Sequence, residues 1–259
     1  MKEHPILFST DMVLAILAGR KTMTRRTVKK QPDLRGVDED NIKDLKPIFE
    51  TWYDEDSNKT RGPEWYLKDE DSEYIQDFFA KAPFGETGDL LWLKEEHLIT
   101  VNGNIIVCEY KDGSKLEKHF KQVSLNTLRN IQKRKTLGKW QRGRFLPKEF
   151  CRIWLEKTAT RVERLHEISI DDIKAEGVRY PVNDRKPVFK LGHENSALSF
   201  IPDEVFENGH QNAQFTEEML LNAHWAELWC SINGRENYDS NPWIWVIEFK
   251  VLSTTGKPA

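Results

Sequence analysis

The sequence predicts a mixed α+β fold, in which a small mixed or antiparallel β-sheet, open or closed into a barrel, has short helices packed outside. Segments typical of strands and of helices follow one another without the regular strand–helix–strand order of a parallel α/β fold. With 259 residues and 38% apolar content, the chain can bury a sizeable core. We therefore expect a single domain over residues 1–259, with long insertions at about 27–82, 111–146 and 179–214.

Residues 12–19, MVLAILAG, are the first expected helix. A side-chain oxygen from the preceding Ser-Thr-Asp run can cap its N-terminus, and Gly19 suits the left-handed conformation that ends many helices. Residues 88–96 and 104–110 are expected strands because apolar and polar side chains alternate in the first and β-branched residues fill the second. The Asn102-Gly103 pair is typical of a hairpin turn leading into the second of them.

The second half of the chain is expected to hold strands at 151–165 and 241–252 and helices at 169–177 and 216–230. Ser169 and Gly177 are placed to cap and to end the shorter helix. Thr216 caps the longer one, where Phe215 and Leu220 occupy the two positions of a hydrophobic staple.

Residues 33–89 carry an unbalanced charge, with 17 Asp or Glu against 7 Lys or Arg. They contain few β-branched residues and several glycines and prolines, which favours a loop-rich, solvated and partly flexible insertion. We expect one helix within it, near 72–81, and we expect residues 179–214 to be irregular.

Residues 129–148 have the opposite character, with eight Lys or Arg and no Asp or Glu. Basic side chains neutralise phosphates and aromatic faces stack on bases, so Lys139, Trp140, Arg142 and Arg144 are candidate nucleic-acid-binding residues. A cationic surface loop that balances the acidic insertion explains the same pattern equally well. The formal net charge of the whole chain, −3, neither supports nor excludes a nucleic-acid partner.

The three cysteines lie far apart in the sequence and show no spacing typical of a metal site. We interpret Cys108, Cys151 and Cys230 as reduced, mostly buried thiols, and we expect neither a metal nor another cofactor. No signal-peptide-like region follows the start and no apolar run approaches bilayer length. A cytoplasmic protein without a membrane partner is therefore expected.

The segment GRKTMTRR, residues 19–26, concentrates a lysine, hydroxyl groups and three arginines. A threonine hydroxyl becomes a nucleophile when a base takes its proton, and a lysine can be that base when burial or nearby cations lower its pKa. Lys21 and Thr24 are thus candidate catalytic residues, although their spacing alone favours a basic turn with a capping threonine. Arg20 and Arg25 are interpreted as surface charges.

This segment resembles the G-x-K-x-x-T-x-R motif of the ASCH superfamily, through Gly19, Lys21, Thr24 and Arg26. Three later blocks resemble phage- and prophage-type ASCH proteins in the family's order: APFGETGDLLWLKEE, LPKEFCRIWLEKTATRVERLHEISIDDIKAEGV and ELWCSINGRENYDSNPWIWVIEFKVL. The resemblance implies a PUA-like β-barrel with a cleft beside it that binds RNA or a nucleoside.

The first motif is also similar to that of a bacterial branch of the superfamily which hydrolyses N4-acetylcytidine to cytidine and acetate without a metal. In that branch a lysine, a threonine and a later glutamate are catalytic, which here implies Lys21, Thr24 and Glu176. Arg26 would bind a phosphate or hold the carboxylate, and Glu95 or Glu96 is an alternative to Glu176.

Three functions remain open. The first is binding of RNA or a modified nucleoside in the cleft. The second is an amidohydrolase that removes an acyl group from an N4-acylcytidine-like base with the same residues. The third is a non-catalytic phage or prophage accessory protein that acts through protein contacts.

Overall fold

The computed structural model describes residues 1–32, 45–54, 58–68, 75–78, 81–133, 136–178 and 216–258. The chain divides into two compact units, each assembled from separated stretches of sequence. Unit 1 consists of Met1–Met23, Phe84–Ala159 and Ile247–Ala259. Unit 2 consists of Thr24–Pro83 and Thr160–Val246.

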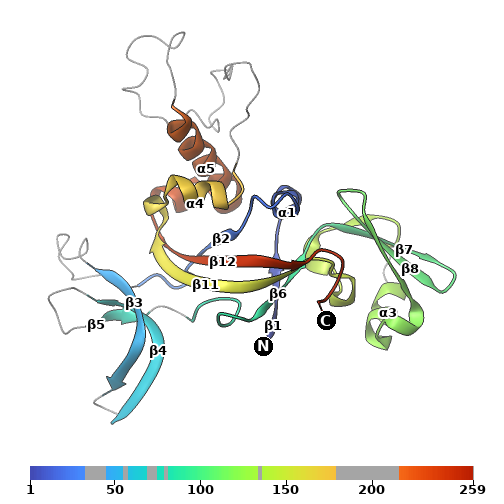
Figure 1. Ribbon diagram of the computed structural model, residues 1–259, viewed down its shortest axis with the longest axis horizontal. Helices are drawn as coiled ribbons and strands as arrows, with labels where there is room; N and C mark the ends of the chain where they lie inside the picture. Colours follow the sequence, from blue (N-terminus) through green and yellow to red (C-terminus); the bar gives the residue numbers. More distant parts are fainter. Residues whose placement is uncertain are drawn as a thin grey trace, which may run out of the picture. The chain divides into compact units, whose positions relative to one another are not determined.

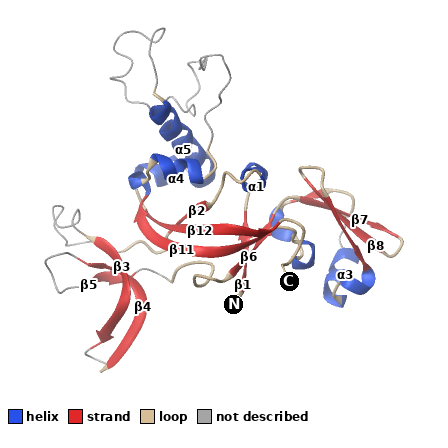
Figure 2. Ribbon diagram, in the orientation of Figure 1, coloured by secondary structure: helices blue, strands red, loops and turns tan. Residues whose placement is uncertain are grey.

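Strands predominate over helices among the described residues, so the predicted mixed α+β class is confirmed (Figures 1 and 2). The elements of unit 1 are β1 (Glu3–Leu7), α1 (Thr10–Leu17), β6 (Leu90–Lys94), β7 (His97–Asn102), β8 (Ile105–Tyr110), β9 (Lys115–His119), α3 (Leu125–Gln132), β10 (Trp140–Gln141) and short 3-10 turns at Phe120–Gln122, Gly143–Phe145 and Lys148–Phe150. Those of unit 2 are β3 (Lys46–Asp54), β4 (Lys59–Lys68), β5 (Ile75–Phe78), a 3-10 turn at Leu165–Glu167, α4 (Ile170–Ala175), α5 (Glu217–Asn233) and α6 (Arg235–Asp239).

Three further strands, β2 (Met23–Thr27), β11 (Trp154–Arg164) and β12 (Trp243–Ser253), contribute residues to both units. They belong to a five-stranded sheet of order β1-β6-β11-β12-β2, in which Figure 1 shows β11 and β12 as long neighbouring strands. The sheet is mixed, because β1 runs parallel to β6 while β11 runs antiparallel to it. A mixed sheet is what the irregular order of strand-like segments predicted.

A second sheet in unit 1 has the order β10-β7-β8-β9. The predicted Asn102-Gly103 turn joins β7 to β8, and Gly103 has a positive φ of 58°. One face of this sheet packs against α3, which begins after the N-cap Ser124. Their shared core consists of Ile99, Ile106, Cys108, Tyr110, Val123, Ile131, Leu146 and Phe150.

The acidic insertion differs from its prediction. Instead of loops it contributes a three-stranded antiparallel sheet, β3-β4-β5, to unit 2. The strand Ile75–Phe78 lies where we expected the helix near 72–81, so that prediction is wrong. Aromatic residues recur among the charged ones in β3 and β4, and such residues fit a half-buried sheet surface.

The other three helix predictions, at 12–19, 169–177 and 216–230, are confirmed, whereas α3 and α6 were not expected. Ser9 caps α1 by accepting from the backbone N–H of Met12, and Ser169 and Thr216 cap α4 and α5 in the same way. Within unit 2, α5 buries Trp225 and Trp229, whose ring centroids are 5.5 Å apart. Phe215 and the predicted irregular segment 179–214 lie outside the described residues.

The strands described here form open sheets, and no closed barrel is found among them. Within the same ranges, no helix combines the length and the apolar character needed to cross a bilayer. All three cysteines are free thiols, with Cys108 and Cys151 buried and Cys230 partly exposed. Burial raises the pKa of the Cys151 thiol to about 12, which is consistent with the predicted inert thiols.

Asp89 ties the start of the chain to β6 in unit 1. Its carboxylate accepts from the backbone N–H of Lys2 at 2.7 Å and from that of Glu86 at 3.1 Å. It also lies 3.2 Å from Nε2 of His4. These hydrogen bonds lower the pKa of Asp89 to about 2, and the one from the backbone N–H of Lys2 has the largest effect. Gly85, with φ at 72°, lies against both His4 and Asp89 and leaves no room for a side chain.

We predict that Asp89→Asn destabilises the protein at pH 7 by about 1–2 kcal/mol, because charged hydrogen bonds to the first strand are weakened. The folded-state pKa lies below the unfolded value, so this stabilisation is present above about pH 4 and is lost as the pH falls towards 2. Urea unfolding at several pH values measures the difference between the two proteins. The stabilising role of Asp89 is contradicted if the difference in free energy of unfolding does not narrow below pH 4. It is also contradicted if the exposed control Glu117→Gln destabilises the protein equally.

Candidate functional site

The segment 19–26 leaves α1 in a tight turn. Gly19 has a φ of 68°, and the backbone N–H groups of Arg20 and Lys21 both donate to the carbonyl of Ala15, at 2.9 and 3.2 Å. The turn carries Lys21 into the interior of unit 1, where the residue is 1% exposed. Its ammonium group lies 5.6 Å from the centroid of the Phe8 ring. The alternative interpretation of this segment as a solvated basic turn therefore does not fit Lys21, because its side chain is buried.

Thr24 and Arg26 follow in β2 and belong to unit 2. Thr24 is 1% exposed, and its hydroxyl accepts a hydrogen bond of 3.0 Å from Nη1 of Arg26. The same nitrogen donates to the backbone carbonyl of Arg25. Burial lowers the pKa of Arg26, and the negative charge of Glu176 opposes this effect. The hydroxyl of Thr24 is thus held beside a cation.

Arg25 is a correction to the sequence interpretation, which treated it as a surface charge. Its side chain is fully buried, at 0% exposure. The guanidinium donates to Glu163 at 2.7 Å, to Asp172 at 2.6 Å and to Glu176 at 3.3 Å. The sequence contains no local signal for this role, because the three carboxylates lie 138 to 151 residues further along the chain.

Glu176 is the C-cap residue of α4, and its side chain is only 3% exposed. We name the group of Arg25, Arg161, Glu163, Asp172 and Glu176 the arginine–carboxylate cluster. Arg161 pairs with Glu163 at 3.1 Å and with Asp172. Three carboxylates thus meet two arginines in the cluster, with Arg26 as a third cation coupled to Glu176.

The structure places the predicted catalytic residues in two groups. Thr24, Arg26 and Glu176 lie in unit 2, linked through the hydrogen bond to Thr24 and the charge of Glu176. Lys21 lies in unit 1. Chemically, Glu176 offers a carboxylate oriented by Arg25, Thr24 offers a hydroxyl polarised by Arg26, and Lys21 offers a buried amine.

Glu95, the alternative carboxylate, is committed to another buried ion pair in unit 1. Arg152 binds both of its oxygens, Nε to Oε1 at 2.9 Å and Nη2 to Oε2 at 2.7 Å. Arg152 also donates to Asp112 at 2.8 Å and stacks 4.2 Å from the ring centroid of Tyr110. Burial raises the pKa of Glu95, and Arg152 opposes that rise. Glu96 instead is 42% exposed and forms an ion pair of 3.6 Å with Lys111.

The basic segment carries two exposed aromatic side chains in unit 1, Trp140 at 42% and Phe145 at 47% exposure. A cation lies over each ring: Lys111 is 4.0 Å from the Trp140 centroid and Arg144 is 4.8 Å from that of Phe145. Lys139, Arg142 and Arg144 are also exposed, and none of them pairs with a carboxylate among the described residues. We name these five residues with Lys111 the aromatic–cation surface.

Among the residues that the structure describes, no group of three or more His, Cys, Asp or Glu side chains is arranged to hold a metal ion. Comparison of this chain with protein-family models, with curated proteins and with solved structures finds no match. The functional interpretation therefore rests on the geometry of two groups of residues. One is the buried group around β2 and α4, and the other is the exposed aromatic–cation surface.

We predict that Arg25→Met lowers the free energy of unfolding by about 3–5 kcal/mol, because it leaves buried carboxylates without their cation. The matched control is Arg235→Gln, which removes an exposed ion pair between residues 235 and 239 and should cost less than about 1 kcal/mol. Urea unfolding followed by circular dichroism measures both. Equal losses for the two variants would show that Arg25 is not the buried centre of the cluster.

Proposed function

We propose that this chain is a PUA-like protein of the ASCH superfamily that binds RNA, and that the aromatic–cation surface forms part of its RNA-binding site. The observation that carries the proposal is the pairing of exposed rings with exposed basic side chains, on a surface where Lys139, Arg142 and Arg144 have no carboxylate partner among the described residues. Trp140 and Phe145 are exposed, and each lies beside a basic side chain. The sequence of the segment 129–148 agrees, with eight basic residues, no acidic residue and aromatic residues interleaved among them.

Each part of this surface matches one requirement of single-stranded RNA. Bases that are not paired stack on exposed aromatic rings, which tolerate any base because every base has a π-face. Phosphates bind arginine and lysine side chains that are not already neutralised. Lys139, Arg142 and Arg144 meet this condition, because none of them pairs with a carboxylate among the described residues. Burial of a tryptophan side chain stabilises the fold, so the exposure of Trp140 favours a role in binding.

Binding of a fluorescent single-stranded RNA, measured by anisotropy at several salt concentrations, tests the proposal. Trp140→Ala should weaken binding by about tenfold, since stacking on one base contributes about 1–3 kcal/mol. Its matched control is Phe49→Ala, which removes a ring of similar exposure, 45%, in unit 2. Equal affinities of the two variants would contradict a stacking role for Trp140.

The triple variant Lys139→Gln, Arg142→Gln and Arg144→Gln should reduce the salt dependence of RNA binding. Removing three phosphate contacts should lower the slope of log K against log salt by about 2, from about 0.7 per contact for a single strand. A slope that does not change would mean that these cations do not contact phosphates. If the parent protein binds no RNA at all, the proposal fails and an accessory protein that acts through protein contacts becomes the better explanation.

A second candidate function, a metal-free amidohydrolase acting on an N4-acylcytidine-like base, is favoured by one observation. Lys21, Thr24 and Glu176 are all less than 5% exposed, although lysine and glutamate are rarely buried without a specific role. In this proposal Lys21 takes the proton of the Thr24 hydroxyl, which attacks the acyl carbon, and Glu176 relays that proton to the leaving amine as the C–N bond breaks. Water then hydrolyses the acyl–Thr24 ester, which releases the carboxylic acid and restores the hydroxyl.

Incubation with N4-acetylcytidine and related N4-acylcytidines, followed by chromatography, tests the amidohydrolase. Lys21→Met and Glu176→Gln should lower turnover by at least about 100-fold, because each removes a proton-transfer group. Both substitutions keep the volume of the side chain, and circular dichroism of each variant checks that it folds. This second candidate is rejected if Lys21→Met keeps its turnover, or if the parent protein hydrolyses no substrate of this panel.

A further inference from the structure

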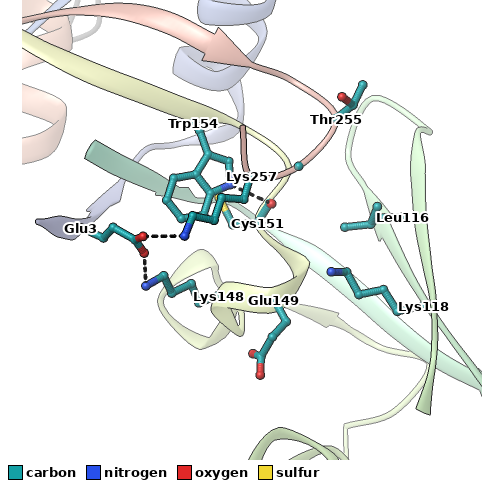
Figure 3. A pocket seen from close by; sticks show the side chains of 10 residues that line it. Glu3, Leu116, Lys118, Lys148, Glu149, Cys151, Trp154, Thr255 and Lys257 are labelled. Carbon is teal, nitrogen blue, oxygen red and sulfur yellow. Dashed lines mark hydrogen bonds and ion pairs between the residues drawn. The ribbon is translucent and has the colours of Figure 1, made fainter. Parts of the chain in front are cut away.

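A pocket in unit 1, lined by none of the candidate site residues described above, has the size of a small-molecule site. Its volume is about 470 Å³, within the range of about 300–1,000 Å³ that is typical of ligand pockets. It lies between the start of β1, the strand β9, the turn that leads into β11 and the residues that follow β12 (Figure 3). Leu116, Cys151 and Trp154 supply its apolar lining.

Lysine side chains give this pocket an excess of positive charge. Lys148 and Lys257 both pair with the single carboxylate of Glu3, the latter at 2.8 Å. Lys118 is half-buried, and Figure 3 shows its amino group pointing into the pocket from the wall opposite Glu3. No carboxylate among the described residues pairs with Lys118, whereas Lys115 on the same strand pairs with Glu109 at 3.2 Å.

The second carboxylate of the lining, Glu149, does not pair with these lysines. Its oxygens accept hydrogen bonds from the hydroxyls of Ser124, at 2.7 Å, and Thr127, at 3.0 Å, next to the N-terminus of α3. Figure 3 shows its carboxylate turned away from the three ammonium groups. Three lysines and two carboxylates line the pocket, so it has one formal positive charge in excess, and Lys118 has no carboxylate partner among the described residues.

We propose that this pocket binds a small phosphate monoester, with the phosphate between Lys118 and the lysine pair and the organic part against Leu116 and Trp154. An anion in the pocket can contact Lys118 on one wall and the Lys148–Lys257 pair on the other, which suits the several oxygens of a phosphate better than the two of a carboxylate. Lysine binds phosphate as a point charge, and all the basic residues that line this pocket are lysines. This site is independent of the proposed RNA surface and of the buried residues around β2 and α4.

Isothermal titration calorimetry of the full chain with ribose 5-phosphate, uridine 5′-monophosphate, inorganic phosphate, ribose and uridine tests the proposal. At least one monoester should bind more tightly than inorganic phosphate and than its unphosphorylated counterpart. Lys118→Gln should weaken that binding by at least about tenfold, because it removes a charged contact to the phosphate. Lys121→Gln is the matched control, an exposed lysine just beyond the same strand, and should leave the affinity unchanged.

A second variant predicts a change in the opposite direction. Glu3→Gln removes the carboxylate that competes for Lys148 and Lys257, so it should bind the monoester several-fold more tightly than the parent protein. Weaker binding by Glu3→Gln would overturn the proposed position of the phosphate. The proposal also fails if no monoester binds, if the unphosphorylated compounds or inorganic phosphate bind equally well, or if Lys118→Gln and Lys121→Gln behave alike.

Discussion

The cost of burying a charge is the constraint on which the interior of each unit depends. An arginine taken out of water is stable only when carboxylates and hydrogen bonds replace its hydration. Arg25 meets this requirement with three carboxylates in unit 2, and Arg152 meets it with Glu95 and Asp112 in unit 1. These side chains come from distant parts of the chain, so each ion pair also connects segments that are far apart in the sequence.

The same constraint divides the charged residues of this protein into two kinds. Those of the arginine–carboxylate cluster are neutralised within the fold and act by holding Glu176 and its neighbours in one geometry. Lys139, Arg142 and Arg144 of the aromatic–cation surface lack a neutralising carboxylate among the described residues. The same holds for Lys118 in the pocket, and such charges are available to a ligand. The net charge of −3 conceals this division, because it adds buried and exposed charges together.

Local signals in the sequence predicted local structure well. Capping side chains at Ser9, Ser169 and Thr216 marked real helix starts, and the Asn102-Gly103 pair marked a real hairpin, because each acts through a few neighbouring backbone groups. The strands of the acidic insertion were missed since their aromatic residues are interleaved with charges, and composition averaged over the whole insertion hides that pattern. A count of aromatic residues in short windows would have found them.

The sequence by itself determined the mixed α+β class, the capped starts of three helices, the hairpin and the residue types of the candidate sites. Tertiary structure alone decided which of those residues are buried and what they contact. Arg25 and Arg144 cannot be told apart by their neighbours in the sequence, yet one lies among three carboxylates and the other beside an exposed ring. The reason is that the energy of a charged group depends on its solvation and on partners more than a hundred residues away, which no local pattern records.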